Sequence, residues 1–288
     1  MQSLKAVLAL RSACALGEGP VWWDGALWFV DIEGRALHRF EPDEAQHDVH
    51  ETPGRIGFAV PSRAHGWLVA QDASLAGFRP GGGPPRILGP VEEPVAGTRL
   101  NDGKSDPTGR LYAGTMHLAL EPGKGALYRF GNDLRPERVV ETVSISNGLA
   151  WHELTGSMYY IDSPTGRIDR FDWCPETGEI SGRRPVATLE NGTPDGMCID
   201  RDGKLWVGMW GGSRVACVDP EAGHEVASIG LPCPNVTSCC FGGAALDRLW
   251  ITTARVGMND EALAAHPEAG GVFVADPGTV GLAATPVA

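Results

Sequence analysis

The segment Gly25-Ala26-Leu27-Trp28-Phe29-Val30 begins a pattern that occurs six times along the chain and decides the fold. Each copy opens with a turn residue, usually glycine, and continues with a short aliphatic and aromatic run around one large aromatic anchor. Repeats of roughly 44 residues, rich in strand formers and divided by turns, are typical of the blades of a β-propeller. The sequence therefore predicts an all-β fold, a six-bladed β-propeller, with residues 1–288 as one domain. The anchors lie 39 to 47 residues apart and are Trp28, Trp67, Tyr112, Tyr159, Trp206 and Trp250.

Further strands are expected after each anchor, because apolar and polar residues alternate there between turn-rich stretches. We expect an N-terminal strand around Lys5 to Ala9 to pair with the C-terminal strands and close the ring. Closure of the ring removes unpaired sheet edges. The single predicted helical turn covers Asp260 to Ala265 and is capped near Asn259.

Composition limits the classes of partner. Glycine and proline together supply 61 of the 288 residues (39 and 22), which suits a fold with many tight turns. The net charge of −12 repels phosphate backbones, so no nucleic acid partner is expected. No apolar run approaches the roughly 18 residues of a membrane span, and the N-terminal segment lacks the features of a secretion signal. Seven scattered cysteines without paired spacing indicate reduced thiols and a cytoplasmic protein, and no obligatory protein partner is inferred.

Four units carry an acidic or amide residue beside a glycine in the segment that precedes the anchor. These residues lie 10 to 12 positions before their anchors and are Glu18, Asn101, Asn147 and Asp195. That segment forms the innermost strand of a blade, and equivalent positions in a radial repeat converge on the axis. We therefore expect the four side chains to meet at one mouth of the central channel.

Two carboxylates and two amides at one point would repel each other unless a positive charge lay between them. Oxygen ligands of this kind suit a hard divalent cation. A small number of protein ligands leaves coordination positions for substrate, as a Lewis-acid catalyst requires. The alternative is that these Asx-Gly pairs are turn residues at strand ends. Four occurrences in register, including a glutamate that has no turn preference, favour the cation.

At these residues the chain resembles the family that includes senescence marker protein, gluconolactonases, luciferin-regenerating enzyme and regucalcin. The resemblance implies a six-bladed propeller with one divalent metal held by Glu18, Asn147 and Asp195. It also implies substrate contacts from Arg99 and Asn101. The match covers essentially the whole chain, and its strongest stretches are residues 16–22, 99–104, 113–116, 146–150 and 194–197.

The chain departs from the family pattern at one position. In regucalcin-like members a glutamate shortly after the Gly-Thr-Met segment contacts substrate, and by count this position is Ala119 here. Glu121 lies two residues further on, and His117 lies two residues before it. We expect a substrate pocket that differs in detail, and we interpret His117 first as a solvent-exposed loop residue and second as a lining residue.

The activity that the resemblance implies is hydrolysis of a sugar-acid lactone such as glucono-, xylono- or arabinonolactone. In this hypothesis Asp195 is the catalytic residue that takes a proton from water and returns it to the ring oxygen. Calcium, zinc, manganese, magnesium and ferrous iron all suit the ligand set. One alternative is a calcium-binding, regucalcin-like regulatory protein, and another is a propeller that serves as an interaction scaffold. An open ligand set favours catalysis over tight calcium storage.

Overall fold

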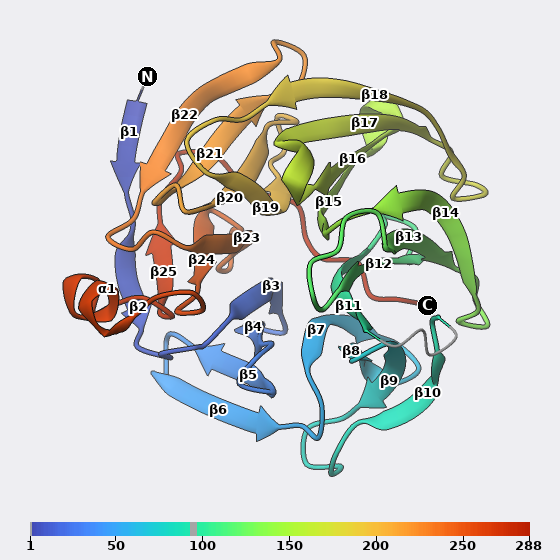
Figure 1. Ribbon diagram of the computed structural model, residues 1–288, viewed down its shortest axis with the longest axis horizontal. Helices are drawn as coiled ribbons and strands as arrows, with labels where there is room; N and C mark the ends of the chain where they lie inside the picture. The colour runs from blue at the N-terminus through green and yellow to red at the C-terminus, as the bar shows by residue number, and fades with distance from the viewer. Residues whose placement is uncertain (1, 93–96) are drawn as a thin grey trace.

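The computed structural model describes residues 2–92 and 97–288, which form six sheets arranged in a ring (Figure 1). This arrangement confirms the predicted all-β, six-bladed β-propeller. In each sheet the strands follow one another from the channel outward. The innermost strands are β3 (Gly17–Trp23), β7 (Ile56–Ser62), β11 (Thr98–Ser105), β15 (Ser146–His152), β19 (Thr193–Ile199) and β23 (Val236–Gly242).

The aromatic anchors lie on the second strand of each blade, and all six are at most 5% exposed. Both faces of these strands are covered by neighbouring blades, so apolar side chains on either face become core. Trp28 and Trp67, for example, come from adjacent blades, and their ring centroids are 4.4 Å apart. The second strands are β4 (Ala26–Asp31), β8 (Gly66–Gln71), β12 (Leu111–His117), β16 (Ser157–Asp162), β20 (Leu205–Trp210) and β24 (Arg248–Thr253).

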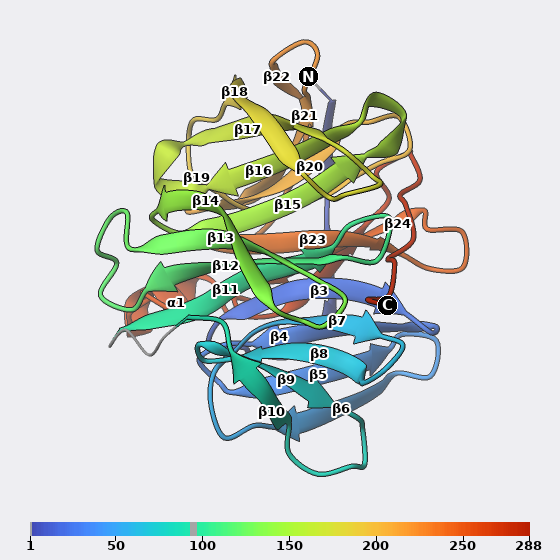
Figure 2. The same cartoon turned by 90° about the vertical axis from the view of Figure 1, so that its right-hand side faces the viewer.

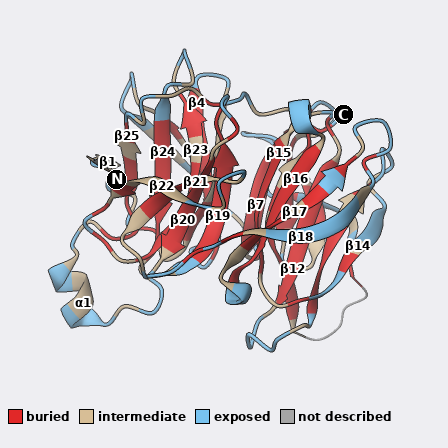
Figure 3. Ribbon diagram, turned by 90° about the horizontal axis from the view of Figure 1, so that it is seen from above, coloured by how far each residue is buried: buried red, intermediate tan, exposed pale blue. Residues whose placement is uncertain are grey.

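The outer strands become more exposed toward the rim, where Figure 3 shows long pale-blue stretches on β14 and β18. The third strands are β5 (Ala36–Glu41), β9 (Ser74–Phe78), β13 (Gly125–Phe130), β17 (Arg167–Trp173), β21 (Arg214–Asp219) and β25 (Val272–Ala275). The fourth strands of the first five blades are β6 (Gln46–Glu51), β10 (Arg86–Pro90), β14 (Pro136–Val143), β18 (Ile180–Thr188) and β22 (His224–Gly230).

The N-terminal segment supplies strands to two blades. β2 (Val7–Leu10) pairs antiparallel with β25 and becomes the fourth strand of the last blade. β1 (Gln2–Lys5) pairs parallel with β22 of the preceding blade, an arrangement that strand patterning alone does not predict. The backbone N–H of Ala6, between these strands, donates to Gly230 O at 3.2 Å. Residues 2–10 therefore join the last two blades to each other.

The C-terminal segment, residues 276–288, follows β25, crosses one end of the ring and appears as the red trace in Figure 1. It exchanges backbone hydrogen bonds with four different blades, at Leu246, Arg201, Gly109 and Pro61. Val287 is 4% exposed and packs into the hydrophobic cluster of the second and third blades. Figure 2 shows the side of the ring on which this segment ends. The segment thus links blades that are far apart in sequence and covers one channel mouth.

Little helix is present. The predicted helical turn is confirmed as α1 (Asp260–Ala265), where Asn259 Oδ1 accepts the backbone N–H of Ala262 at 2.9 Å. Two 3₁₀ turns, η1 (Glu153–Thr155) and η2 (Ser163–Thr165), follow strands of the fourth blade. Among the described residues, none of the helices has the length and apolar character needed to span a bilayer. All seven cysteines are free thiols.

Candidate metal and substrate site in the central channel

Every innermost strand has a β-bulge near its start. The pairing register shifts after Glu18 in β3, after Leu100 in β11, after Asn147 in β15 and after Pro194 in β19, with equivalent shifts in β7 and β23. A bulge breaks the alternation of side chains and re-aims the residues beside it. Because the bulge recurs at the same place in each blade, it acts on the polar residues of all the inner strands alike.

The glycines beside these polar residues allow neighbouring inner strands to approach closely. A Cβ on Gly148 would lie 2.8 Å from Asp195 O, and one on Gly103 would lie 2.5 Å from Cε1 of Phe58 on the neighbouring inner strand. Asn147 and Asp195 lie within strands and not in turns. The glycine of each Asx-Gly pair therefore has a packing role, because any larger residue would meet the next strand.

A chain of hydrogen bonds joins three of the predicted site residues. Arg99 Nη1 donates to Asn101 Oδ1 at 2.6 Å, and Asn101 Nδ2 donates to Asn147 Oδ1 at 3.0 Å. Asn147 Nδ2 donates in turn to Ser163 Oγ at 2.8 Å. Ser163 thus fixes the orientation of the Asn147 amide and leaves its oxygen on the side of Asn101. All three predicted residues are buried.

The two predicted carboxylates, Glu18 and Asp195, are each 8% exposed. Burial raises the pKa of Glu18 to about 8, and the negative charge of Asp102 acts in the same direction. Burial also raises the pKa of Asp195 well above its usual value, with further contributions from Glu18 and then Asp102. The Arg99 guanidinium opposes both shifts. The structure therefore brings several carboxyl groups together, and the positive charge near them does not offset the rise in their pKa values.

Asp102 and Ser163 were not predicted as part of this group. Asp102 directly follows Asn101, and strict strand alternation would place the two side chains on opposite faces. The bulge between Leu100 and Gly103 removes that alternation, and burial raises the pKa of Asp102 as well. In the sequence, Asp102 could have been identified from the Asn101-Asp102-Gly103 triplet, in which it directly precedes the glycine. Nothing in the sequence connects Ser163 to Asn147.

The region of the departure from the family pattern lies at the end of β12. Ala119 and Glu121 are exposed, and the Glu121 side chain is 56% exposed. His117 is more enclosed: it pairs with Thr98, next to Arg99, and its Nδ1 has no hydrogen-bond partner among the described residues. His117 is therefore placed close to the strand that carries Arg99, and the first interpretation of it as a plain solvent-exposed residue is wrong.

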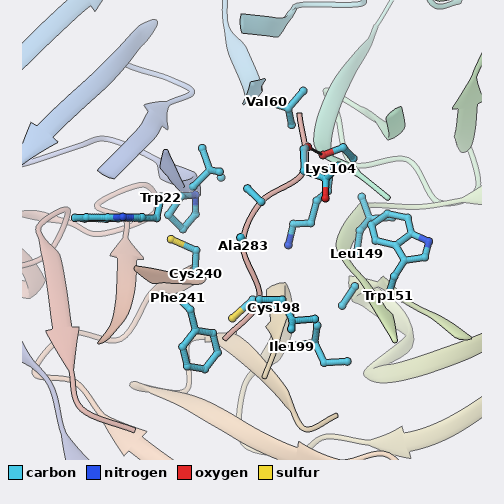
Figure 4. A pocket seen from close by; sticks show the side chains of 18 of the residues that line it. Trp22, Val60, Lys104, Leu149, Trp151, Cys198, Ile199, Cys240, Phe241 and Ala283 are labelled. Atoms are coloured by element: carbon cyan, nitrogen blue, oxygen red, sulfur yellow. Dashed lines mark hydrogen bonds between the residues drawn. The ribbon is translucent and has the colours of Figure 1, made fainter. Parts of the chain in front are cut away.

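A cavity of about 340 Å³ lies further along the channel, past the bulges. None of the five predicted site residues lines it. Its walls come from later positions on the inner strands, among them Asp102, Leu149 and Cys240, and residues 282–285 of the C-terminal segment also line it. Figure 4 shows Lys104 extending between these walls, and its Nζ donates to Met197 O at 2.7 Å. The five predicted residues thus lie in a different part of the channel from this more apolar cavity, and Asp102 borders both.

Fold and site together define a class of six-bladed propeller in which buried carboxylates and amides from several blades meet in the central channel. The chain belongs to the SMP-30/Gluconolactonase/LRE-like family, whose model matches residues 16–255. This membership confirms the resemblance found in the sequence.

Curated relatives and solved structures agree with this assignment. Regucalcin of Danio rerio is 39% identical over 279 residues, covering 95% of this chain and 94% of its own. A luciferin-regenerating enzyme structure has a TM-score of 0.89 at 30% identity, covering 98% of this chain and 99% of its own. The calcium-binding protein regucalcin from Agrobacterium tumefaciens has a TM-score of 0.93 at 25% identity, covering 100% and 99%.

Proposed function

We propose that this protein hydrolyses a sugar-acid lactone with a divalent cation held by Glu18, Asn147 and Asp195. The observation that carries the proposal is the burial of two carboxyl groups from distant blades beside a hydrogen-bonded set of amides and a guanidinium. Membership of a family named in part for gluconolactonase supports the same activity. We further propose a single domain of residues 1–288, working in the cytoplasm on a small molecule without a protein partner.

The proposed ligands have the chemistry that a hard cation requires. Glu18 and Asp195 offer carboxylate oxygens. The hydrogen bond from Asn147 Nδ2 to Ser163 fixes the amide, and its oxygen, which accepts one hydrogen bond from Asn101, keeps a second lone pair for a cation. A divalent cation would offset the negative charges that, together with burial, raise these pKa values: that of Asp102 acting on Glu18, and those of Glu18 and Asp102 acting on Asp195. Calcium, magnesium, manganese, zinc and ferrous iron remain the candidates.

Lactone hydrolysis adds water across the ring ester bond. The bound cation would supply Lewis-acid polarisation of the carbonyl. Asp195 would accept a proton from water as the water oxygen attacks the carbonyl carbon, and would return it to the ring oxygen as that C–O bond breaks. Arg99 and Asn101 would hold the substrate hydroxyls, since a polyol offers several donors and acceptors. The product is the open hydroxy acid.

A proton-release assay on a panel of aldonolactones tests this function. We expect hydrolysis of at least one of glucono-, xylono- and arabinonolactone, with activity lost on chelation and restored by a divalent cation. Turnover that resists chelation, after the metal content is shown to be zero, would contradict the metal-dependent proposal. The panel also identifies the sugar, because hydroxyl stereochemistry changes the contacts made by Arg99 and Asn101.

The second candidate is a calcium-binding protein without a main lactonase role. It is favoured by the names of the relatives, since several are regucalcins and the Agrobacterium structure is described as a calcium-binding protein. This candidate predicts calcium binding at the same ligands and no turnover of any lactone in the panel. Calcium titration alone would not separate the two candidates, whereas the lactone panel does.

Cation binding is expected to strengthen as the pH rises toward 8. In the metal-free folded state Glu18 keeps its proton up to a pKa of about 8, whereas the ordinary pKa of a glutamate side chain is 4.5. Ionisation of Glu18 therefore favours the unfolded state, and metal-free stability should fall as the pH rises from 4.5 to about 8. A bound cation needs the ionised carboxylate, so cation binding releases protons. For each proton released, the cation affinity should rise by up to about tenfold per pH unit.

Calorimetric titration in two buffers of different ionisation enthalpy measures this proton release directly. Melting temperatures with and without the cation, taken from pH 5 to pH 8, give the second measurement, and the difference between them should widen with pH. A cation affinity that is constant over this range would show that Glu18 is not among the ligands.

A further inference from the structure

A second group of metal-binding residue types lies outside the channel, in the first blade. Cys14, Asp31 and His38 each offer one ligand atom, and these atoms all lie within 4.8 Å of one another. The three residues are 1%, 7% and 6% exposed. They come from three segments: the connection between β2 and β3, the end of β4, and β5. A sulfur, an imidazole nitrogen and a carboxylate oxygen thus converge in the core.

The histidine of this group is oriented for coordination. His38 Nδ1 lies 2.9 Å from Nε2 of His47, and His38 Nε2 lies 4.0 Å from Cys14 Sγ. When Nδ1 carries the proton and donates it to His47, the Nε2 lone pair faces the thiol. A second residue that binds the far nitrogen of a ligand histidine in this way is a regular feature of metal sites. Burial, followed by the charge of His47, lowers the pKa of His38 to about 4, so the imidazole is neutral.

Asp31 already has a structural task, but it keeps a free acceptor position. Its Oδ1 accepts the backbone N–H groups of Leu16 and Gly34, and its Oδ2 accepts that of Ala15, each at 2.9 Å. A carboxylate has about four lone-pair sites, so one remains on Oδ2. These hydrogen bonds also fix the position of the carboxylate next to Cys14.

The fourth blade contains an aspartate with the same backbone hydrogen bonds as Asp31 but without a cysteine and a histidine beside it. There Asp162 accepts the backbone N–H groups of Ser144 and Ile145, as Asp31 accepts those of Ala15 and Leu16. The positions that correspond to Cys14 and His38 are Val143 and Asp169. The loop-holding aspartate therefore does not need a thiol and an imidazole beside it, and their presence in the first blade calls for a separate explanation.

We propose that Cys14, Asp31 and His38 form a second metal site that takes a zinc-like divalent cation. The mixed sulfur, nitrogen and oxygen donors suit zinc and not calcium or magnesium, which prefer oxygen alone. Tetrahedral zinc places a thiolate sulfur and an imidazole nitrogen roughly 3.5 Å apart, so the observed 4.0 Å needs a shift of only about half an ångström. On binding, the Cys14 sulfur bonds to the cation and its proton leaves to solvent.

The site lies where the ring closes. Cys14 follows β2, the strand that completes the last blade, and its backbone N–H donates to Gly270 O at 2.8 Å. Asp31 and His38 belong to the first blade. A metal bound by all three would fasten the closing segment of the chain to the blade it meets, and would thereby stabilise the closed ring without touching the channel.

Cobalt(II) is the probe that separates this site from the channel. The channel ligands are all oxygens, so only a cysteine site gives a thiolate-to-cobalt charge-transfer band in the near ultraviolet. We expect the wild-type protein to show this band and Cys14→Ser and His38→Gln to lose it. Cys233→Ser, which changes another buried thiol, and Glu18→Gln, which changes the channel, should both retain it. Zinc added to metal-free Glu18→Gln, whose channel site is weakened, should raise the melting temperature by roughly 5 °C, and that of the double variant Glu18→Gln/Cys14→Ser much less.

Absence of the band in the wild type at saturating cobalt would overturn the proposal. So would persistence of the band in both Cys14→Ser and His38→Gln, because the cobalt would then be bound to other thiols, such as the pair Cys198 and Cys239, whose sulfur atoms are 3.6 Å apart. The use of two variants guards against a folding failure in one of them. The band does not depend on lactone hydrolysis, so its outcome is independent of the proposed function.

Discussion

Asp195→Asn is expected to lower lactone hydrolysis by about 10³-fold even at cation concentrations that compensate for weaker cation binding, while leaving the fold in place. Asparagine keeps the size of the side chain and one oxygen donor, but it cannot accept the proton of the attacking water. The loss should therefore appear in kcat, with a smaller change in KM, because the substrate hydroxyls are held by other residues. Steady-state kinetics at saturating cation measure both terms.

Asp202→Asn provides the matched control, since Asp202 is an exposed residue on the turn that follows the same strand. It should retain full activity. Circular dichroism and melting temperature establish that both variants are folded. Activity of Asp195→Asn within a few-fold of wild type would remove Asp195 from the proton transfers and leave it at most a ligand.

Glu18→Gln is expected to weaken cation binding by about 100-fold or more, and to abolish activity at cation concentrations that saturate the wild type. The change removes one of the two proposed anionic ligands but preserves the shape of the side chain. It also removes the repulsion that raises the pKa of Asp195, so the metal-free variant should be more stable than metal-free wild type at pH 8. The two effects have opposite signs and form a specific signature.

Glu225→Gln makes the same substitution at a glutamate that pairs with Arg214 at 3.0 Å in an outer part of the fifth blade. It should leave cation affinity and activity unchanged. Calorimetric titration with the active cation compares the three proteins. Recovery of Glu18→Gln activity at high cation concentration would support a loss of affinity, whereas wild-type affinity in this variant would show that Glu18 is not a ligand.

The fold was predictable because the repeat is both regular and physically explicit. Each unit has an aromatic anchor that must be buried and turn residues that end the strands, and six such units close into a ring. The same regularity predicted that Glu18, Asn101, Asn147 and Asp195 come from equivalent positions on the inner strands. Residues so far apart in sequence are related here by pseudo-rotation about one axis, so their convergence follows from the repeat alone.

The repeat did not predict the bulges, and the composition of the site depends on them. Regular strand alternation would place the Asp102 and Asn101 side chains on opposite faces. With the register shifted at the bulge, the negative charge of Asp102 raises the pKa values of Glu18 and Asp195. The contact of Ser163 with Asn147 likewise depends on a 3₁₀ turn that ends up beside the inner strand. A bulge puts two residues of one strand opposite one residue of its partner, so it is a property of the strand pair and is not evident from the alternation within one strand.

The sequence by itself determined the number of blades, the location of the aromatic core and the set of polar residues on the inner strands, because each of these follows from a pattern repeated within the chain. Only the tertiary structure decided the orientation of the Asn147 amide, the path of the C-terminal segment across the channel and the meeting of Cys14 with His38. Those contacts have no counterparts in the other repeats, so the repeat pattern does not predict them. They form only when the ring closes.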